Sequence, residues 1–326
     1  MKRIAVFGVG HLGTIHCKCI QQIEGLELVG IYDPDQEKSR KIAEEFGVTA
    51  YENPEMLIAA VDLVDIVTTT SMHFAMGKMA IERGKHTFIE KPVCSTLQEA
   101  EELMRLAKSK NVLIQVGHVE RFNPAFIASQ PYIQRPMFIE SHRLALFNPR
   151  GNDVSVVLDL MIHDLDIILK IMNSDVVSIN ASGVPVVTDT YDIANIRLGF
   201  ANGAVANMTA SRISLKNMRK IRLFQQGHYI SIDLLEKKSD IIYLEDYDDR
   251  QEDPFALVMD LGEEKGKKQI KVLKPEIQPV NAIQTELEYF LNAVTKNELP
   301  VVTIEDGYKA LRLAYDIVAK MNLPVK

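Results

Sequence analysis

The stretch Arg3–Asp33 constrains the fold of this chain more than any other. It begins with the apolar run Ile4–Phe7 and continues with the glycine-rich segment Gly8–Gly13 and a helical pattern. A second apolar run, Leu26–Tyr32, leads into Asp33, which lies 20 residues beyond the last glycine of the loop. A buried strand, a glycine-rich turn, a helix and a second strand in this order are typical of a βαβ unit that binds a dinucleotide.

Each glycine of the loop has a physical role in such a unit. Gly8 is expected to form the tight turn, Gly10 to let a pyrophosphate approach the backbone, and Gly13 to let helix and strand pack closely. The helix that follows offers free N–H groups and the positive end of its dipole to the phosphates. His11 and Leu12, between these glycines, are expected to contact the cofactor as part of the same loop, with solvent as the alternative for His11.

Asp33 bears on the choice of cofactor. Its carboxylate can accept hydrogen bonds from the adenosine ribose hydroxyls, and it would repel a 2′-phosphate. The sequence therefore favours NAD over NADP. Lys38 and Arg40 follow closely enough to offset part of that repulsion, so NADP stays an alternative.

Composition limits the class of protein. With 326 residues, 47% of them hydrophobic and 25% charged, the chain is long enough for two ordinary globular domains. The net charge of -7 and the absence of a basic block argue against a nucleic-acid partner. No apolar run reaches membrane-spanning length and no signal-peptide pattern is present, so we expect a cytoplasmic protein with no membrane partner. The three cysteines fit a reducing compartment and do not have metal-ligand spacing, so no metal is expected.

The order of the expected elements predicts two domains. Up to residue 122, strands alternate with helices over short connections, which indicates a doubly wound parallel sheet of the Rossmann type. From residue 123 to 326, most strands follow one another without helices, which indicates an α+β domain on a mainly antiparallel open sheet. Four further expectations concern this second domain: a long apolar helix over Val154–Met172, a solvated acidic loop over Glu245–Asp253, and closing helices over Ala282–Val294 and Ile304–Met321.

Three polar segments follow strands of the predicted parallel sheet and therefore lie at its carboxyl edge, where ligands of such sheets bind. Glu90-Lys91-Pro92 follows one strand, and Lys91 there either hydrogen-bonds a substrate hydroxyl or is an ordinary surface lysine. Thr69, Thr70 and His73 follow another strand and are expected to contact the nicotinamide half of the cofactor. Arg121 and Asn123 follow the last strand of the domain and either contact substrate or, for Arg121, pair with Glu120.

The helix Val154–Met172 carries a polar stripe of Asp159, His163, Asp166 and Lys170. Such a stripe on a buried helix either lines a cleft or holds an ion-pair network. A carboxylate one turn from an imidazole sets the tautomer of the histidine and raises its basicity, which suits a general base. The pattern alone leaves catalysis and structure open.

The glycine fingerprint, Glu90-Lys91-Pro92 and Asp159-x-x-x-His163-x-x-Asp166 together resemble the Gfo/Idh/MocA family of NAD(P)-dependent oxidoreductases. The resemblance implies that Lys91 polarises the reacting hydroxyl, that Asp159 and His163 contact the sugar, and that His163 is the acid/base. It also implies that Glu90 and Lys91 lie against the cofactor and Asp166 against the substrate. The chain departs from many members at Met161, where they have glycine, and this bears on substrate shape.

Two segments, Val119–Ala125 and Leu158–Asp164, look most like the UDP-N-acetylglucosamine 3-dehydrogenase branch of that family. The implied activity is oxidation of a secondary sugar hydroxyl by hydride transfer to NAD, at C3 of a UDP-N-acetylhexosamine. A free polyol or inositol dehydrogenase, and a non-catalytic NAD-binding sensor, are the alternatives. Retention of Lys91, Asp159 and His163 argues against the sensor.

A nucleotide sugar needs its diphosphate neutralised, and arginine suits that task through its planar fork of donors. The expected contacts are Arg121 and Arg212, with Arg143, Arg150, Lys216 and Arg219 as further cations in the same part of the chain. The alternative is that these are ordinary arginines with other partners.

The run Gly203–Ser211 presents small apolar residues on one face, namely Ala204, Ala206, Met208 and Ala210. A face of this kind must be covered either by helices of its own domain or by a second subunit. Relatives in the family pair through this sheet, which implies a homodimer or homotetramer.

Overall fold

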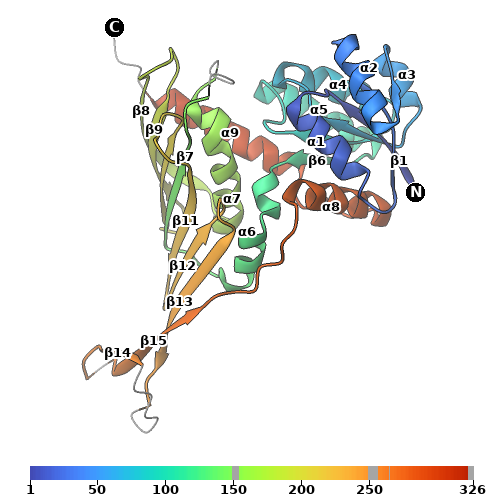
Figure 1. Cartoon of the computed structure of the whole chain (residues 1–326). Helices are drawn as coiled ribbons and strands as arrows, with labels where there is room; N and C mark the ends of the chain where they lie inside the picture. The colour runs from blue at the N-terminus through green and yellow to red at the C-terminus, as the bar shows by residue number, and fades with distance from the viewer. Residues whose placement is uncertain (149–153, 249–255, 264, 322–326) are drawn as a thin grey trace. The chain divides into compact units, whose positions relative to one another are not determined.

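A computed structural model describes residues 1–148, 154–248, 256–263 and 265–321. Its contacts divide the chain into two units, which are described separately (Figure 1). The first contains Met1–Phe122 and Val280–Leu313, and the second contains Asn123–Pro279 and Ala314–Lys326. The division passes through one helix, since α9 runs over Ile304–Lys320. No helix in the described part of the chain is long and apolar enough to cross a membrane.

The first unit is built on a parallel six-stranded sheet in the order β3-β2-β1-β4-β5-β6. This confirms the predicted doubly wound arrangement, in which the strand order reverses beside β1. Residues Ile4–Phe7 of β1 are completely buried, as expected for a strand covered on both faces. The strands are β1 (Lys2–Phe7), β2 (Leu26–Tyr32), β3 (Thr49–Ala50), β4 (Leu63–Ile66), β5 (His86–Glu90) and β6 (Ile114–Gly117).

The helices of this sheet begin and end where local sequence signals place them. Asp35 caps α2 by accepting from Lys38 N, and a capping box between Thr96 and Glu99 begins α5. Asn111 ends α5 in the left-handed conformation. The helices are α1 (His11–Ile20), α2 (Gln36–Phe46), α3 (Pro54–Ala59), α4 (Thr70–Glu82) and α5 (Leu97–Lys110), with a 3₁₀ turn η1 (Val119–Phe122).

Helix α8 (Ala282–Lys296) joins the first unit, although the sequence assigned it to the second domain. Its residues Leu287, Phe290 and Val294 belong to the same core cluster as β1 and α1, and Phe290 meets Phe88 of β5 edge to face. An amphipathic pattern predicts that a helix has a buried face but not which domain covers it. The C-terminal part of the chain therefore returns to complete the dinucleotide-binding fold.

The second unit is built on a sheet in the order β14-β15-β13-β12-β11-β7-β10-β9-β8. All neighbouring strands in this order pair antiparallel except β7 with β10, so the predicted mainly antiparallel sheet is confirmed (Figure 1). The bounds are β7 (Phe138–Leu144), β8 (Val176–Val184), β9 (Ile193–Phe200), β10 (Val205–Ser211), β11 (Met218–Gln225), β12 (His228–Asp233), β13 (Lys238–Asp246), β14 (Leu257–Asp260) and β15 (Lys267–Leu273).

The acidic segment Glu245–Asp253 is not the simple loop that the sequence predicted. Its first two residues end β13 and pair with β15, and residues 249–253 lie outside the described part. Strands β14 and β15 were missed altogether, because the side chains of β14 are exposed and those of β15 are at most half-buried, so neither strand has a buried apolar face.

Helices of the same unit accompany this sheet. Helix α6 (Pro124–Ser129) packs on β12 and β13, and a short 3₁₀ turn η2 (Gln130–Tyr132) follows it. The long helix predicted over Val154–Met172 is shorter and is not uniform. A π-helical turn, η3 (Val157–Met161), precedes the α-helix α7 (Ile162–Met172).

The small apolar face of β10 is covered within a single copy of the chain. Ala204, Ala206, Met208 and Ala210 are all buried, and β10 contacts η3. The face therefore does not call for a second subunit, which corrects the physical argument for assembly. The predicted homodimer or homotetramer then depends on the family resemblance alone.

Candidate functional site

The glycine loop of the first unit has the geometry that a bound pyrophosphate requires. Gly8 has a φ of +89°, and a Cβ there would lie 2.7 Å from the backbone of Thr68. A Cβ on Gly13 would lie 1.9 Å from Gly8 O, so helix and strand approach as closely as predicted. At Gly10, by contrast, a Cβ would meet no described atom within 4 Å, and Gly10 caps α1 without a side-chain hydrogen bond. The loop thus leaves space and backbone donors at the helix start. His11 is exposed and Leu12 partly so, which keeps both accessible to a ligand.

Asp33 is fixed at the end of β2 by three donors. Val9 N donates to Oδ2 at 2.8 Å, Asp35 N donates to Oδ1 at 3.0 Å, and Lys38 Nζ lies 2.9 Å from Oδ2. The carboxylate is thereby held beside the glycine loop, where a ribose would lie. The ammonium of Lys38 lies against the same oxygen that would repel a 2′-phosphate, so this geometry does not by itself decide between NAD and NADP.

The Glu90-Lys91-Pro92 segment ends β5, but its two side chains differ in placement. Glu90 is buried, and its Oε2 accepts a hydrogen bond of 3.1 Å from Lys91 N. A Cβ on Gly117 of the neighbouring β6 would lie 2.6 Å from Glu90 Oε1, so the glycine makes room for the carboxylate. Glu90 was predicted to contact the cofactor, whereas the structure directs its carboxylate into the protein. Lys91 is half-buried at the edge of the sheet.

His73 also turns inward. Its Nδ1 lies 2.9 Å from Pro92 O and its Nε2 lies 3.1 Å from Thr68 O, and the side chain is buried. Burial, opposed by these carbonyls, lowers the pKa of His73. The geometry supports a brace between the segments after β4 and β5 rather than the predicted direct contact with the cofactor. Thr69 and Thr70 lie at the start of α4, with Thr69 exposed.

Beneath these segments lies a buried group of ionisable residues that the sequence analysis did not single out. His16 of α1 contacts Asp65 of β4 at 2.9 Å and Glu90 at 3.5 Å, and Glu286 of α8 completes the group. One signal was present in the sequence, since Glu286 falls on the apolar face of its helix beside Leu287 and Phe290. An acidic residue on such a face rarely lacks a role.

In the second unit, Asp159 lies in the π turn and His163 in the first turn of α7, and both are half-buried. Asp166 is buried with 1% of its surface exposed, whereas Lys170 is exposed. The predicted polar stripe is therefore not one continuous face, because the wider π turn changes the register of the residues before Ile162. Of the two acids expected to meet substrate, Asp159 is the accessible one.

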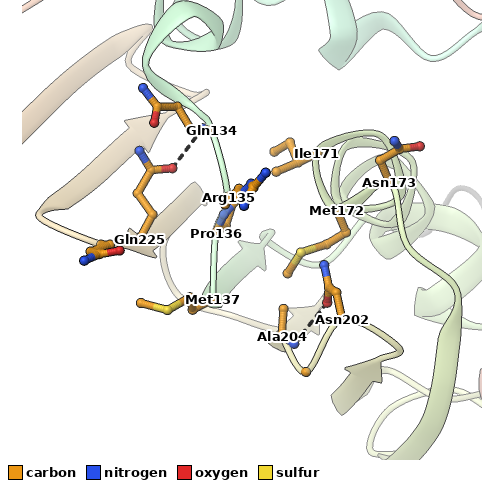
Figure 2. Close-up of a pocket in the computed structure, with 12 residues that line it drawn as sticks. Gln134, Arg135, Pro136, Met137, Ile171, Met172, Asn173, Asn202, Ala204 and Gln225 are labelled. Carbon is orange, nitrogen blue, oxygen red and sulfur yellow. Dashed lines mark hydrogen bonds between the residues drawn. The ribbon is translucent and has the colours of Figure 1, made fainter.

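Asp159 lines a pocket of about 530 Å³ within the second unit, together with Leu160, Asn148, Asn217 and Arg212. A larger pocket of about 850 Å³ lies elsewhere in this unit, among the segments Gln134–Met137, Ile171–Asn173 and Asn202–Ala204 (Figure 2). None of the predicted site residues lines the larger pocket.

The arginines expected to meet a diphosphate already have protein partners. Arg212 donates from Nη2 to Val154 O at 2.5 Å and to Tyr191 O at 2.9 Å, and its Nε lies 3.4 Å from Asp192 Oδ1. Arg143 forms a bidentate pair with Asp164, at 3.0 Å and 2.8 Å. These contacts favour structural roles, although one side of Arg212 borders the pocket with Asp159. Arg150 lies outside the described residues.

Arg121 and Asn123 are buried as well. Arg121 Nη2 lies 3.9 Å from Asp306 Oδ2 at the start of α9. Asn123 Oδ1 accepts from Ala125 N at 3.1 Å and caps α6, while Nδ2 donates to Leu234 O at 2.9 Å. Capping and ion pairing explain both side chains, so the geometry gives no support to the predicted direct contact with substrate.

Family models match both parts of the chain. Residues 2–118 match the model described as "Oxidoreductase family, NAD-binding Rossmann fold", and residues 137–226 match the "GFO/IDH/MocA C-terminal domain". The chain belongs to the Gfo/Idh/MocA family. It is accordingly an NAD(P)-dependent oxidoreductase of the dehydrogenase type, and the geometry of the glycine loop and of Asp33 fits that cofactor class.

Three relatives within this family are informative. The chain is 39% identical over 234 residues to the UDP-N-acetylglucosamine 3-dehydrogenase of Acidithiobacillus ferrooxidans, covering 72% of this chain and 74% of that protein. A solved structure of that enzyme superposes with a TM-score of 0.87 over 98% of this chain and 97% of the other, at 32% identity. The myo-inositol 2-dehydrogenase of Thermotoga maritima is 26% identical, covering 99% and 97%. The scyllo-inositol 2-dehydrogenase of Bacillus subtilis is 29% identical, covering 65% and 68%.

Proposed function

We propose that this Gfo/Idh/MocA oxidoreductase uses NAD to oxidise a secondary hydroxyl of a nucleotide sugar, at C3 of a UDP-N-acetylhexosamine. The observation that carries the proposal is the similarity to the A. ferrooxidans enzyme, which is higher in identity than that to the inositol dehydrogenases and extends over nearly the whole fold. Reaction class and cofactor class follow from the family, and the sugar and its reacting carbon are the new part of the proposal.

The residues proposed to hold the cofactor are those whose geometry leaves room for it. Gly8, Gly10 and Gly13 shape the loop, and the N–H groups of His11 and Leu12 lie at the start of α1. Asp33 accepts from the ribose hydroxyls, which favours NAD. Thr69 and Thr70 lie at the start of α4, at the same edge of the sheet. The bound nicotinamide ring supplies the hydride acceptor.

The chain's own residues are proposed to handle the proton. Lys91 donates a hydrogen bond to the reacting hydroxyl and stabilises negative charge on its oxygen. His163 accepts the hydroxyl proton as general base, and Asp159 orients the sugar from the accessible side of the π turn. Asp166 and Arg212 are both buried, and Arg212 borders the pocket that Asp159 lines.

A free polyol dehydrogenase is the second candidate, because inositol dehydrogenases are also among the relatives. The buried state of Arg121 and Arg143 weakens the earlier electrostatic argument for a diphosphate, so the choice now depends on the family branch. A non-catalytic sensor would need none of Lys91, Asp159 and His163.

A substrate panel tests the proposal. Purified protein is mixed with NAD and, separately, UDP-N-acetylglucosamine, UDP-N-acetylgalactosamine, glucose and myo-inositol, and NADH formation is followed at 340 nm. NADH should form with the UDP-sugars, and the product should carry a keto group at C3 in the NMR spectrum. Equal or faster reduction with myo-inositol would assign the chain to the polyol dehydrogenases instead.

A further inference from the structure

The buried group formed by His16, Asp65, Glu90 and Glu286 brings three carboxyl groups around one imidazole. The side chains of His16 and Asp65 are 0% exposed, and that of Glu90 is 10% exposed. Glu286 is completely buried on α8. Ionisation of all three acids around a neutral imidazole would place three negative charges in the protein interior, which is far more costly than protonating some of them.

Hydrogen bonding in this group is incomplete. Among the described residues, Asp65 Oδ1, both carboxyl oxygens of Glu286 and His16 Nε2 are buried polar atoms without a hydrogen-bond partner. Gln115 Oε1 is a fourth such oxygen, and Gln115 Nε2 donates to the backbone carbonyl of Glu286 at 2.6 Å. Because buried polar atoms are almost always paired, extra protons are expected on the acids.

The distances within the group show which carboxyl groups the two ring nitrogens of His16 face. His16 Nδ1 lies 2.9 Å from Asp65 Oδ2, and its Nε2 faces Glu90 Oε1 at 3.5 Å. A ring nitrogen of His16, one carboxyl oxygen of Glu90 and one carboxyl oxygen of Glu286 all lie within 4.8 Å of one another. One water can bridge such a spacing, since each of its hydrogen bonds spans about 2.8 Å.

We propose that Glu286 is protonated in the folded enzyme and, together with imidazolium His16, holds the carboxylate of Glu90 and thereby positions Lys91. The link to Lys91 is the hydrogen bond from its backbone N–H to Glu90 Oε2, with Gly117 leaving the space that Glu90 occupies. Glu286 and His16 are thus positioning residues, contributed by α8 and α1. This inference rests on the proposed role of Lys91 for its effect on turnover, but not for the protonation states themselves.

The titration behaviour of the group agrees with this arrangement. Burial raises the pKa of Glu286 well above its ordinary value, and the charge of Glu90 adds to the shift. Burial alone would lower the pKa of His16, but Asp65 and Glu90 outweigh it and raise that pKa well above the usual range. His73 is a further titratable neighbour of Glu90, and burial lowers the pKa of His73, so the imidazole adds no positive charge at neutral pH. Two thiols of α1 are also neighbours of the group. Burial raises the pKa of Cys17 to about 12 and also raises that of Cys19, so neither supplies a charge at neutral pH.

A neutral isostere provides the sharpest test. If Glu286 carries a proton, Glu286→Gln changes neither charge nor shape, so kcat and the affinity for NAD should stay within about twofold of wild type. Glu286→Leu removes the donor and should lower kcat by about tenfold or more while NAD affinity changes less. Glu288→Gln, at a half-buried carboxylate of α8 that accepts a hydrogen bond from Gln284 Nε2, is the control on the same helix. Loss of activity in Glu286→Gln comparable to that in Glu286→Leu would overturn the proposal.

The protonation states can be read without any substrate. Nitrogen-15 NMR of labelled His16 should show both ring nitrogens protonated at pH 7 in the wild type and in Glu286→Gln. Glu90→Gln should make His16 lose its proton at lower pH.

A neutral His16 in the wild type, or one equivalent of a tightly bound divalent metal that is lost in Glu286→Gln, would contradict the proposal. Normal NMR results with no effect on turnover in Glu286→Leu would instead refute the positioning of Lys91. Because the NMR results need no turnover, they stand even where the substrate proposal fails.

Discussion

Lys38 Nζ lies 2.9 Å from Asp33 Oδ2, so the carboxylate that selects the ribose already has a cation beside it. This pair decides how strongly the chain discriminates against a 2′-phosphate. A lone carboxylate would repel the phosphate, whereas a paired one presents a smaller net charge, and Lys38 is flexible enough to turn toward a phosphate.

Asp33→Ala should therefore weaken NAD binding by about 10- to 100-fold, since hydrogen bonds to a charged group are lost. The same change removes the partner of Lys38, so the difference in affinity between NAD and NADP should become smaller. Calorimetric titration with each cofactor measures both affinities. Arg83→Ala, which removes a partly exposed ion pair with Glu55, is the control and should change little. A wild-type protein that prefers NADP would show that Lys38 outweighs Asp33.

Two glycines of the same loop should separate folding from cofactor binding. Gly13→Ala places a Cβ 1.9 Å from Gly8 O and should lower the melting temperature markedly, whereas Gly10→Ala meets no described atom and should leave it unchanged. If pyrophosphate approaches at Gly10, that variant should lose NAD affinity while remaining folded. Thermal unfolding with and without NAD distinguishes the two effects. Unchanged NAD affinity in Gly10→Ala would place the pyrophosphate elsewhere.

Lys91→Met tests the proposed chemistry at the edge of the sheet. Turnover should fall by about 100-fold or more, because the reacting oxygen loses its hydrogen-bond donor. NAD affinity should stay within a few-fold, since Asp33 and the glycine loop are intact. Lys78→Met, which removes an ion pair with Glu102 on α4 and α5, is the matched control. Undiminished kcat in the Lys91 variant would exclude the residue from the reaction.

Asp192 is expected to make the stability of the second unit depend on pH. Burial would raise the pKa of Asp192, but N–H donors from Thr188, Val187 and Val186 outweigh it and lower the pKa to about 2. Because the folded-state pKa lies below the value of about 3.9 in unfolded chains, the ionised group stabilises the fold above about pH 4. That stabilisation is lost as the pH falls toward 2.

Urea unfolding of wild type and Asp192→Asn from pH 7 to pH 2 measures this contribution. The variant should be less stable at pH 7, and the difference should shrink as the pH falls below about 4. Asp175→Asn, at an exposed carboxylate of the same unit, should show little difference at any pH. A difference for Asp192→Asn that stays constant down to pH 2 would refute the assignment.

The sequence predicted those parts of the fold whose signals are local. A buried strand beside a glycine loop and the alternation of strands and helices both depend on neighbours in the chain. The π turn before Ile162 has no such signal, because the residues of η3 would fit an ordinary α-helix equally well. Strand β15 was missed because it has no fully buried face that a sequence pattern would show. It is placed in the sheet by its backbone pairing with β13.

The orientation of the predicted site residues did not follow from the sequence. Sequence position places Glu90 and His73 at the edge of the sheet, yet Glu90 turns inward to His16 of α1, and His73 turns inward to the backbone oxygens of Thr68 and Pro92. Arg121 and Asn123 likewise follow a strand at the expected edge but are used for an ion pair and a helix cap. The contact of Arg121 with Asp306 forms only when the fold brings α9 back to the first unit.

The proposed substrate is tested by the initial rate of NAD reduction with UDP-N-acetylglucosamine, compared with the rate with myo-inositol at equal concentration. We expect rapid NADH formation with the UDP-sugar, oxidation at C3, and little reaction with the polyol. A rate with myo-inositol that equals or exceeds the rate with the UDP-sugar would contradict it.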